Sequence, residues 1–147
     1  MNNLHATAVA LNQKGILLQG PPGAGKSTLA LRLIDEGAAL ISDDQTLLRR
    51  EGDEVFLEAP PAIAGLLEIR GVGVARLACA RAPLVLAVDL CPRPENAERL
   101  PDPGFIEILG RSVRRFSIDP FAADACARIR FMLRAALEAD FLVDTGS

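Results

Sequence analysis

The chain has 147 residues, of which 50% are hydrophobic and 24% are charged, a composition typical of a globular protein and not of a disordered one. The formal net charge of -3 gives no basic field, and the absence of Trp and Tyr removes the usual base-stacking side chains, so we expect no nucleic-acid partner. The length predicts a single domain over residues 1–147.

The cysteine content indicates a reducing environment. Cys79, Cys91 and Cys126 form no C-x-x-C pair and are accompanied by a single histidine, so we expect buried, reduced thiols in a cytoplasmic protein. No basic stretch followed by a long apolar run occurs near the N-terminus, and no apolar run has membrane-spanning length. The sequence therefore predicts neither a signal peptide nor a membrane partner.

The first predicted elements are two strands of a hairpin. Residues 4–11 are apolar with β-branched members, residues 12–15 have turn composition, and residues 16–19 form the second strand. Antiparallel pairing would bring His5 close to Gly20. The sequence leaves two interpretations of His5 open: a group that hydrogen-bonds phosphate or assists proton transfer, or a solvent-facing residue at a strand end.

The hairpin leads into Gly-Pro-Pro-Gly-Ala-Gly-Lys-Ser at residues 20–27, and helix formers follow over residues 27–36. This is the G-x-x-x-x-G-K-S pattern of a phosphate-binding loop (P-loop) in its usual strand–loop–helix context. Two prolines in the loop have no N–H, so the amides of residues 23–28 are expected to bind the phosphates. The alternative is a glycine-rich turn that binds nothing. The expected nucleotide-binding residues are Gly20, Pro21, Pro22, Gly23, Ala24, Gly25, Lys26, Ser27 and Thr28.

An acidic pair follows the predicted helix. Residues 38–42 have the composition of a buried parallel strand, which ends at Asp43 and Asp44. Carboxylates at a strand end beside a nucleotide crevice are where α/β proteins place catalytic groups. We interpret one as the base for an attacking hydroxyl and the other as bridging to a metal through water. The alternative is a helix cap or a turn.

The middle of the chain predicts a surface hairpin from residues 46–49 and 54–58. Next, residues 65–74 contain a strand followed by two glycines that are two residues apart, and strand alternation places Glu68 and Arg70 on one face. From the pattern alone, a surface salt bridge between these two is preferred over a pair that binds metal and phosphate.

The last third predicts a central buried strand at residues 82–90, a proline-rich loop, and short strands at residues 105–109 and 112–118. The final helix is expected to begin with Asp119 as N-cap and Pro120 at its first position. Its solvent-facing side is expected to carry two i,i+4 ion pairs, Asp124 with Arg128 and Arg134 with Glu138.

Together these motifs resemble the catalytic domain of HPr kinase/phosphorylase, which phosphorylates a serine of the phosphocarrier protein HPr. The resemblance is densest over residues 4–75 and is to the short form found in proteobacteria. The most characteristic stretch is E-I-R-G-V-G at residues 68–73. The other matching stretches are residues 5–11, 20–27, 29–37, 42–45 and 99–101.

This resemblance implies an α/β fold with a P-loop-containing mixed sheet and flanking helices. It also implies ATP and Mg²⁺ as cofactors, HPr as protein substrate, a homo-oligomer, and regulation of the phosphotransferase system and carbon metabolism. Reverse phosphorylase activity stays open, because residues 110–115 match the corresponding segment of the family poorly. Pro22 stands where the family usually has a serine, which leaves the nucleotide contacts of the early loop open. A small-metabolite P-loop kinase and a non-catalytic ATP-binding module are the alternatives.

The family's roles fall on particular positions of this sequence. The implied metal ligands are Ser27 and Glu68. The implied proton acceptor is Asp44, with Asp43 close behind. The implied catalytic set is Asp44, Asp43, His5, Lys26 and Arg99.

Overall fold

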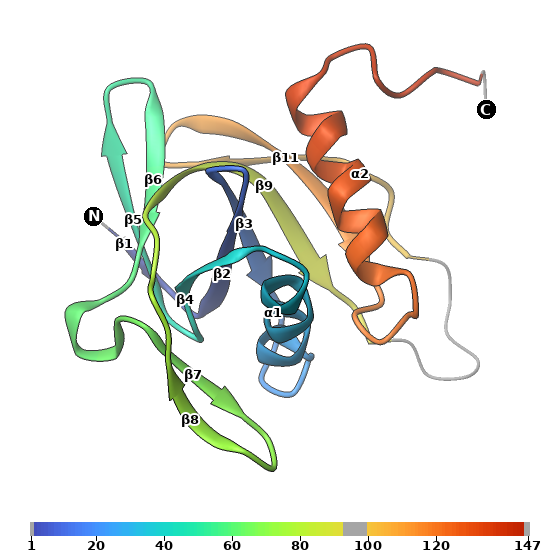
Figure 1. Ribbon diagram of the computed structural model, residues 1–147. Coiled ribbons are helices and arrows are strands. Elements are labelled where there is room, and N and C mark those ends of the chain that lie inside the picture. The colour runs from blue at the N-terminus through green and yellow to red at the C-terminus, as the bar shows by residue number, and fades with distance from the viewer. Residues whose placement is uncertain (1, 93–99, 146–147) are drawn as a thin grey trace.

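The computed structural model describes residues 2–92 and 100–145 of the chain (Figure 1). No helix in these ranges is both long and apolar enough to cross a membrane. The helices are α1 (Lys26–Asp35), the short 3-10 turn η1 (Pro61–Ile63) and α2 (Ala125–Leu137). The strands are β1 (Asn2–Leu4), β2 (Ala6–Leu11), β3 (Lys14–Gln19), β4 (Ala39–Ser42), β5 (Thr46–Glu51), β6 (Glu54–Glu58), β7 (Leu66–Ile69), β8 (Gly73–Arg76), β9 (Ala82–Leu90), β10 (Gly104–Ile108) and β11 (Arg111–Ile118).

A mixed sheet with the order β1-β5-β6-β9-β3-β2-β4 forms the centre of the fold. Strand β9 is parallel to β3 and to β11, whereas the β6–β9, β2–β3 and β2–β4 pairs are antiparallel. Because β9 is long, β6 pairs with its start and β11 with its second half. This confirms the central position predicted for residues 82–90.

Side-chain alternation along the central strands divides the apolar residues between two cores. Ile16 and Leu18 face α1 and α2, while Leu17 faces the opposite core with Ile41 and Leu57. The second core receives only alanines from β2, and these small side chains let the strands of that side pack closely. Both helices thus cover one face of the sheet.

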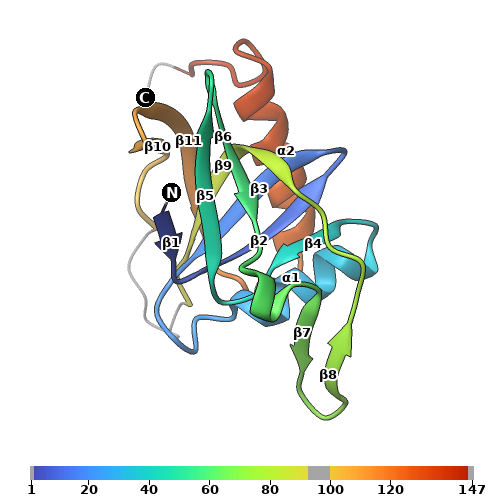
Figure 2. The same ribbon diagram turned by 90° about the vertical axis from the view of Figure 1, so that its left-hand side faces the viewer.

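A separate two-stranded hairpin, β7–β8, projects away from the sheet beside α1 (Figures 1 and 2). Two strands alone are marginally stable in water, so the hairpin depends on contacts with the body. Leu67 supplies one of them, since its side chain is fully buried. The tip of the hairpin is exposed, with Val72 79% accessible.

The predicted N-terminal hairpin is confirmed, with Ala6 opposite Gln19 and a turn of positive φ at Asn12 and Gln13. The chain bends at His5, because β1 pairs with β5 while β2 pairs with β3. The expectation of a parallel strand at residues 38–42 is wrong: β4 pairs antiparallel with β2. Since β2 is antiparallel to both neighbours, β4 still runs in the direction of β3 and ends at the same edge.

The predicted start of the last helix is also wrong. Helix α2 begins at Ala125 with Asp124 as N-cap, and the preceding residues form a turn. The Oδ1 of Asp119 accepts from the backbone N–H of Phe121 at 3.0 Å, so the carboxylate caps this turn and not the helix. The predicted ion pairs at Asp124 and Arg134 are confirmed.

Two expectations about burial need correction. The β5–β6 hairpin is part of the sheet and not a surface addition, because Leu48 and Leu57 are buried and β6 pairs with β9. Of the cysteines, Cys126 is buried, Cys91 is half-buried and Cys79 is exposed. Burial raises the pKa of the Cys126 thiol.

Candidate active site

The glycine-rich loop joins the end of β3 to the start of α1. Ala24 N–H donates to Pro21 O at 3.0 Å, which closes the first turn of the loop without an N–H from either proline. Gly25 precedes the helix with φ 98°, a left-handed conformation that favours glycine. Sequence reasoning placed these elements correctly, and the helix begins one residue earlier than expected, at Lys26.

The N-terminus of α1 is open to an anion. The first helical hydrogen bond runs from Leu29 N to Gly25 O at 2.9 Å, so the amides of residues 26–28 precede it and point out of the helix end. No side chain in the described ranges caps this end, and its first turn holds no acidic residue. The positive end of the helix dipole is therefore directed at the loop.

Lys26 folds back over the loop. Its side chain is nearly buried, with 8% exposed, and its ammonium donates to Gly20 O at 2.7 Å and Pro21 O at 3.3 Å. A buried ammonium requires acceptors, which these two carbonyls supply. The geometry holds the positive charge against the interior of the loop.

Asp43 joins three elements through one carboxylate oxygen. Its Oδ1 accepts from Ser27 Oγ at 2.7 Å and from Thr7 Oγ1 at 3.1 Å. Ser27 is in the first turn of α1, whereas Thr7 is fully buried in β2. The sequence analysis missed Thr7, although it is the one polar residue in an otherwise apolar strand.

Asp44 lies in a tight turn with φ 67°, an uncommon conformation for a residue other than glycine. The turn is closed by a hydrogen bond from Gln45 N to Asp43 O at 2.8 Å, which spans only two residues, as in a γ-turn. The hydroxyl of Ser42 donates to Gln45 O and braces the turn from inside. Such strain costs about 1–3 kcal/mol and is concentrated at functional sites.

A cavity of about 640 Å³ brings the predicted residues together. Lys26 and Ser27 line it from the loop and α1, Asp43 and Asp44 from the end of β4, and Glu68 from β7. Arg70 also lines it, from the turn after β7 and not from the strand. The pattern favoured a salt bridge between Glu68 and Arg70. Both side chains are described, and they form no salt bridge with each other.

The structure does not place two of the predicted catalytic residues at this cavity. His5 is exposed and, as expected from the hairpin, precedes the residue paired with Gln19. It is not among the residues that line the cavity. Arg99 lies outside the described residues, in the range 93–99.

The donor set fits Mg²⁺. Ser27 Oγ, the carboxylates of Asp43 and Asp44, and Glu68 face one cavity, and oxygen ligands are those that Mg²⁺ prefers. Among the described residues, no group of three His, Cys, Asp or Glu side chains is close enough to form a protein-only metal cage. Mg²⁺ needs no such cage, because it is usually held by one or two protein groups together with phosphate oxygens and water.

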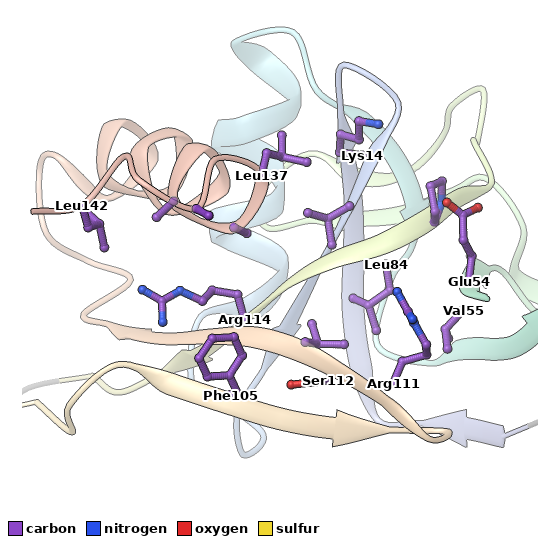
Figure 3. A pocket seen from close by; sticks show the side chains of 16 residues that line it. Lys14, Glu54, Val55, Leu84, Phe105, Arg111, Ser112, Arg114, Leu137 and Leu142 are labelled. Carbon is purple, nitrogen blue, oxygen red and sulfur yellow. The ribbon is translucent and has the colours of Figure 1, made fainter.

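A second cavity, of about 610 Å³, lies away from this site (Figure 3). Arg111 and Arg114 line it from β11, and Leu137 lines it at the end of α2. Lys14, the first residue of β3, is also part of its wall, so the length of β3 separates it from the glycine loop. None of the predicted site residues lines this cavity.

A family model for the HPr serine kinase C-terminal domain matches residues 1–79, just over half of the chain. The chain belongs to this family. The matched range contains the glycine loop, the Asp43–Asp44 turn and the β7–β8 hairpin.

Individual relatives match about half of the chain. An HPr kinase/phosphorylase of Exiguobacterium sp. is 40% identical over 75 residues, which is 50% of this chain and 24% of that protein. One from Mycoplasmopsis pulmonis is 42% identical over 71 residues, 48% of this chain and 23% of that protein. The chain thus spans about a quarter of the length of these relatives.

The fold extends the similarity beyond the matched half. A structure described as the Hpr(Ser) kinase/phosphatase from Coxiella burnetii superposes with a TM-score of 0.78 over 92% of this chain and 90% of that one. At 24% identity this likeness shows the fold alone. The mixed α/β fold expected from the resemblance is confirmed.

Proposed function

We propose that this chain is the catalytic domain of a serine kinase that transfers the γ-phosphoryl group of ATP to HPr, and that its glycine-rich loop is a P-loop. The observation that carries the proposal is the 2.7 Å hydrogen bond from Ser27 Oγ to Asp43 Oδ1, which joins the acidic end of β4 to the first turn of the helix after the glycine-rich loop. Kinases of the P-loop class use this arrangement of a P-loop Ser or Thr and a strand-end Asp to hold Mg²⁺.

In this proposal the backbone amides at the start of α1 and the side chain of Lys26 bind the phosphates. The amides at the start of α1 would receive the phosphate oxygens, and the ammonium would exchange its loop carbonyls for them. Ser27, Asp43 and Glu68 would hold Mg²⁺, which supplies neutralisation of the phosphate charge. His5, one residue before the Ala6–Gln19 pair, is proposed to reach the terminal phosphates, and Arg99 is proposed as a further catalytic residue.

Asp44 is proposed as the proton acceptor. Two hydroxyls already donate to Asp43, whereas the Asp44 side chain is exposed at the cavity wall. A target serine would approach there, its oxygen forming the new bond to the γ-phosphorus while the bond to the β–γ bridging oxygen breaks. The hydroxyl proton passes to Asp44, and ADP leaves.

The natural partner is proposed to be HPr, because the relatives of this chain are named for it. We expect the chain to form a single domain, to assemble as a homo-oligomer and to act in the cytoplasm. Its proposed biological role is control of the phosphotransferase system. Reverse phosphorylase activity is left outside the proposal.

The test is formation of phosphoserine on purified HPr in the presence of ATP and Mg²⁺. We expect Asp44→Asn to reduce the rate by at least about 100-fold. Asp53→Asn is the matched control, because Asp53 lies in the exposed β5–β6 turn. Phosphate transfer to a sugar or acid without HPr would indicate a metabolite kinase, and ATP binding without any transfer would indicate a regulatory module; either result contradicts the proposal.

A further inference from the structure

Three parallel strands set the layout of the candidate site. β3, β9 and β11 run in the same direction and therefore end at the same edge of the sheet. The glycine loop follows β3, and the turn at residues 119–121 follows β11, two strands away. On the other side, β4 delivers Asp43 and Asp44. In the order of the sheet, the loop after β3 thus lies between the end of β4, which carries the acidic pair, and the turn after β11.

Phe121 is the outermost residue of that turn. Its side chain is 59% exposed, yet it lines the same cavity as the glycine loop. A Cβ built on Gly25 would lie 3.0 Å from the Phe121 ring, so the ring rests directly on the residue before α1. Thr28 and Leu31 of α1 also line this cavity.

The ring is held in place by its backbone. Asp119 Oδ1 accepts from Phe121 N–H at 3.0 Å, and Ala122 N–H donates to Asp119 O at 3.2 Å. Arg32, on α1, donates to Pro120 O at 3.0 Å and to Ala123 O at 3.2 Å. The helix that begins at the glycine loop therefore also fixes the turn that carries Phe121. This accounts for the late start of α2, because these residues are tied to α1 instead of continuing the helix.

We propose that Phe121 is the stacking platform for the base of the bound nucleotide. The inference rests on the proposed function and adds the direction in which the nucleotide lies. Its terminal phosphate faces Asp43, Asp44 and Glu68, its phosphate chain crosses the start of α1, and its base lies on the Phe121 ring. Every nucleobase offers a π-face, so a platform of this kind accepts adenine and guanine alike.

The experiment compares ligands with and without a base. Binding of ATP, GTP and tripolyphosphate, each with Mg²⁺, is measured by calorimetry for the wild type and for Phe121→Ala. We expect the variant to bind both nucleotides at least about 10-fold more weakly and to bind tripolyphosphate within about 2-fold of the wild type. Phe131→Ala is the matched control, because Phe131 is 57% exposed on α2 and does not line this cavity; it should change none of the three affinities.

A fluorescence measurement gives an independent readout. The chain contains no Trp and no Tyr, so Phe121→Trp introduces a single reporter at the proposed platform. ATP should quench or shift its emission, and tripolyphosphate should leave it unchanged.

Each remaining outcome overturns the inference. If Phe121→Ala weakens tripolyphosphate as much as ATP, the ring only supports the loop. If neither nucleotide is weakened, the base lies elsewhere. A wild type that binds tripolyphosphate while Phe121→Ala leaves ATP unaffected refutes the platform and leaves the proposed function standing. A wild type that binds none of the ligands refutes both.

Discussion

The hydroxyl of Thr7 accepts a hydrogen bond from the backbone N–H of Asp44 at 3.0 Å, and through it the middle strand β2 fixes the acidic turn at the end of β4. The same hydroxyl donates to Asp43 at 3.1 Å. A strained backbone persists only where its surroundings hold it, and Thr7 is one of those restraints.

Replacing Thr7 by Val should therefore affect both stability and catalysis. The change leaves the Asp44 N–H without its partner, so we expect the free energy of unfolding in urea to fall by about 1–3 kcal/mol. The rate of phosphoryl transfer should fall by more than the loss of folded protein accounts for, because the Asp43–Asp44 turn loses its restraint. Thr46→Val is the control: Thr46 is equally buried and donates to Ala6 O at 2.8 Å, so it should cost similar stability with activity retained. Equal activity in the two variants would contradict this role for Thr7.

Lys26→Met should abolish phosphate binding without unfolding the protein. The methionine keeps most of the apolar volume of the nearly buried side chain but removes the ammonium that is held against the loop carbonyls. We expect ATP affinity to fall by at least about 100-fold, corresponding to about 3 kcal/mol. Lys14→Met is the control, because Lys14 lies at the opposite end of β3. ATP titration of both variants checks the prediction, and unchanged affinity in Lys26→Met would contradict it.

Leu67→Ala should detach the β7–β8 hairpin. Leu67 is fully buried, whereas the neighbouring tip is exposed, so its loss removes a main anchor of a two-stranded sheet. We expect about 2–5 kcal/mol of destabilisation by urea denaturation, together with a lower affinity for Mg²⁺-ATP because Glu68 loses its position. Val74→Ala, at a side chain that is 67% exposed, should change stability by no more than about 0.5 kcal/mol. Faster hydrogen exchange confined to residues 66–76 in Leu67→Ala would identify the detached segment; unaltered exchange there would argue against the anchor.

The cysteines should react in the order of their exposure. Burial raises the pKa of the Cys126 thiol above its ordinary value, which lowers the fraction of the reactive thiolate at any given pH. Peptide mapping after brief iodoacetamide treatment at pH 7 should find Cys79 alkylated first and Cys126 last. Preferential early labelling of Cys126 would show that α2 opens in solution.

The same shift predicts a pH dependence of stability. The folded protein keeps the Cys126 proton to higher pH than the unfolded chain does, so the folded state binds more protons above the ordinary thiol pKa. Stability should therefore fall as pH rises through that range and be fully present below it. Cys126→Ala should flatten this part of the urea-stability profile, whereas Cys79→Ala should not.

The sequence by itself determined the local structure around the glycine loop. The glycine spacing, the paired strands before it and the helix after it were predictable because each depends on neighbouring residues: turn chemistry, strand alternation and helical periodicity. For the same reason the β5–β6 hairpin and the separate strands β10 and β11 were predicted almost at their observed limits, although the pairing of β10 with β11 was not predicted. The sequence also placed Asp43 and Asp44 at a strand end, but the turn there was only the alternative interpretation.

Only the tertiary structure decided which of these elements meet. The placement of β2 between β3 and β4 made Thr7 a partner of Asp43, and strand order is not encoded in the composition of any one strand. The turn at Phe121 depends on Arg32, which is 88 residues from Pro120 in the chain. The Asp-Pro signal for a helix start was outweighed by these long-range hydrogen bonds, because a local preference of about 1 kcal/mol is smaller than several bonds to one charged guanidinium.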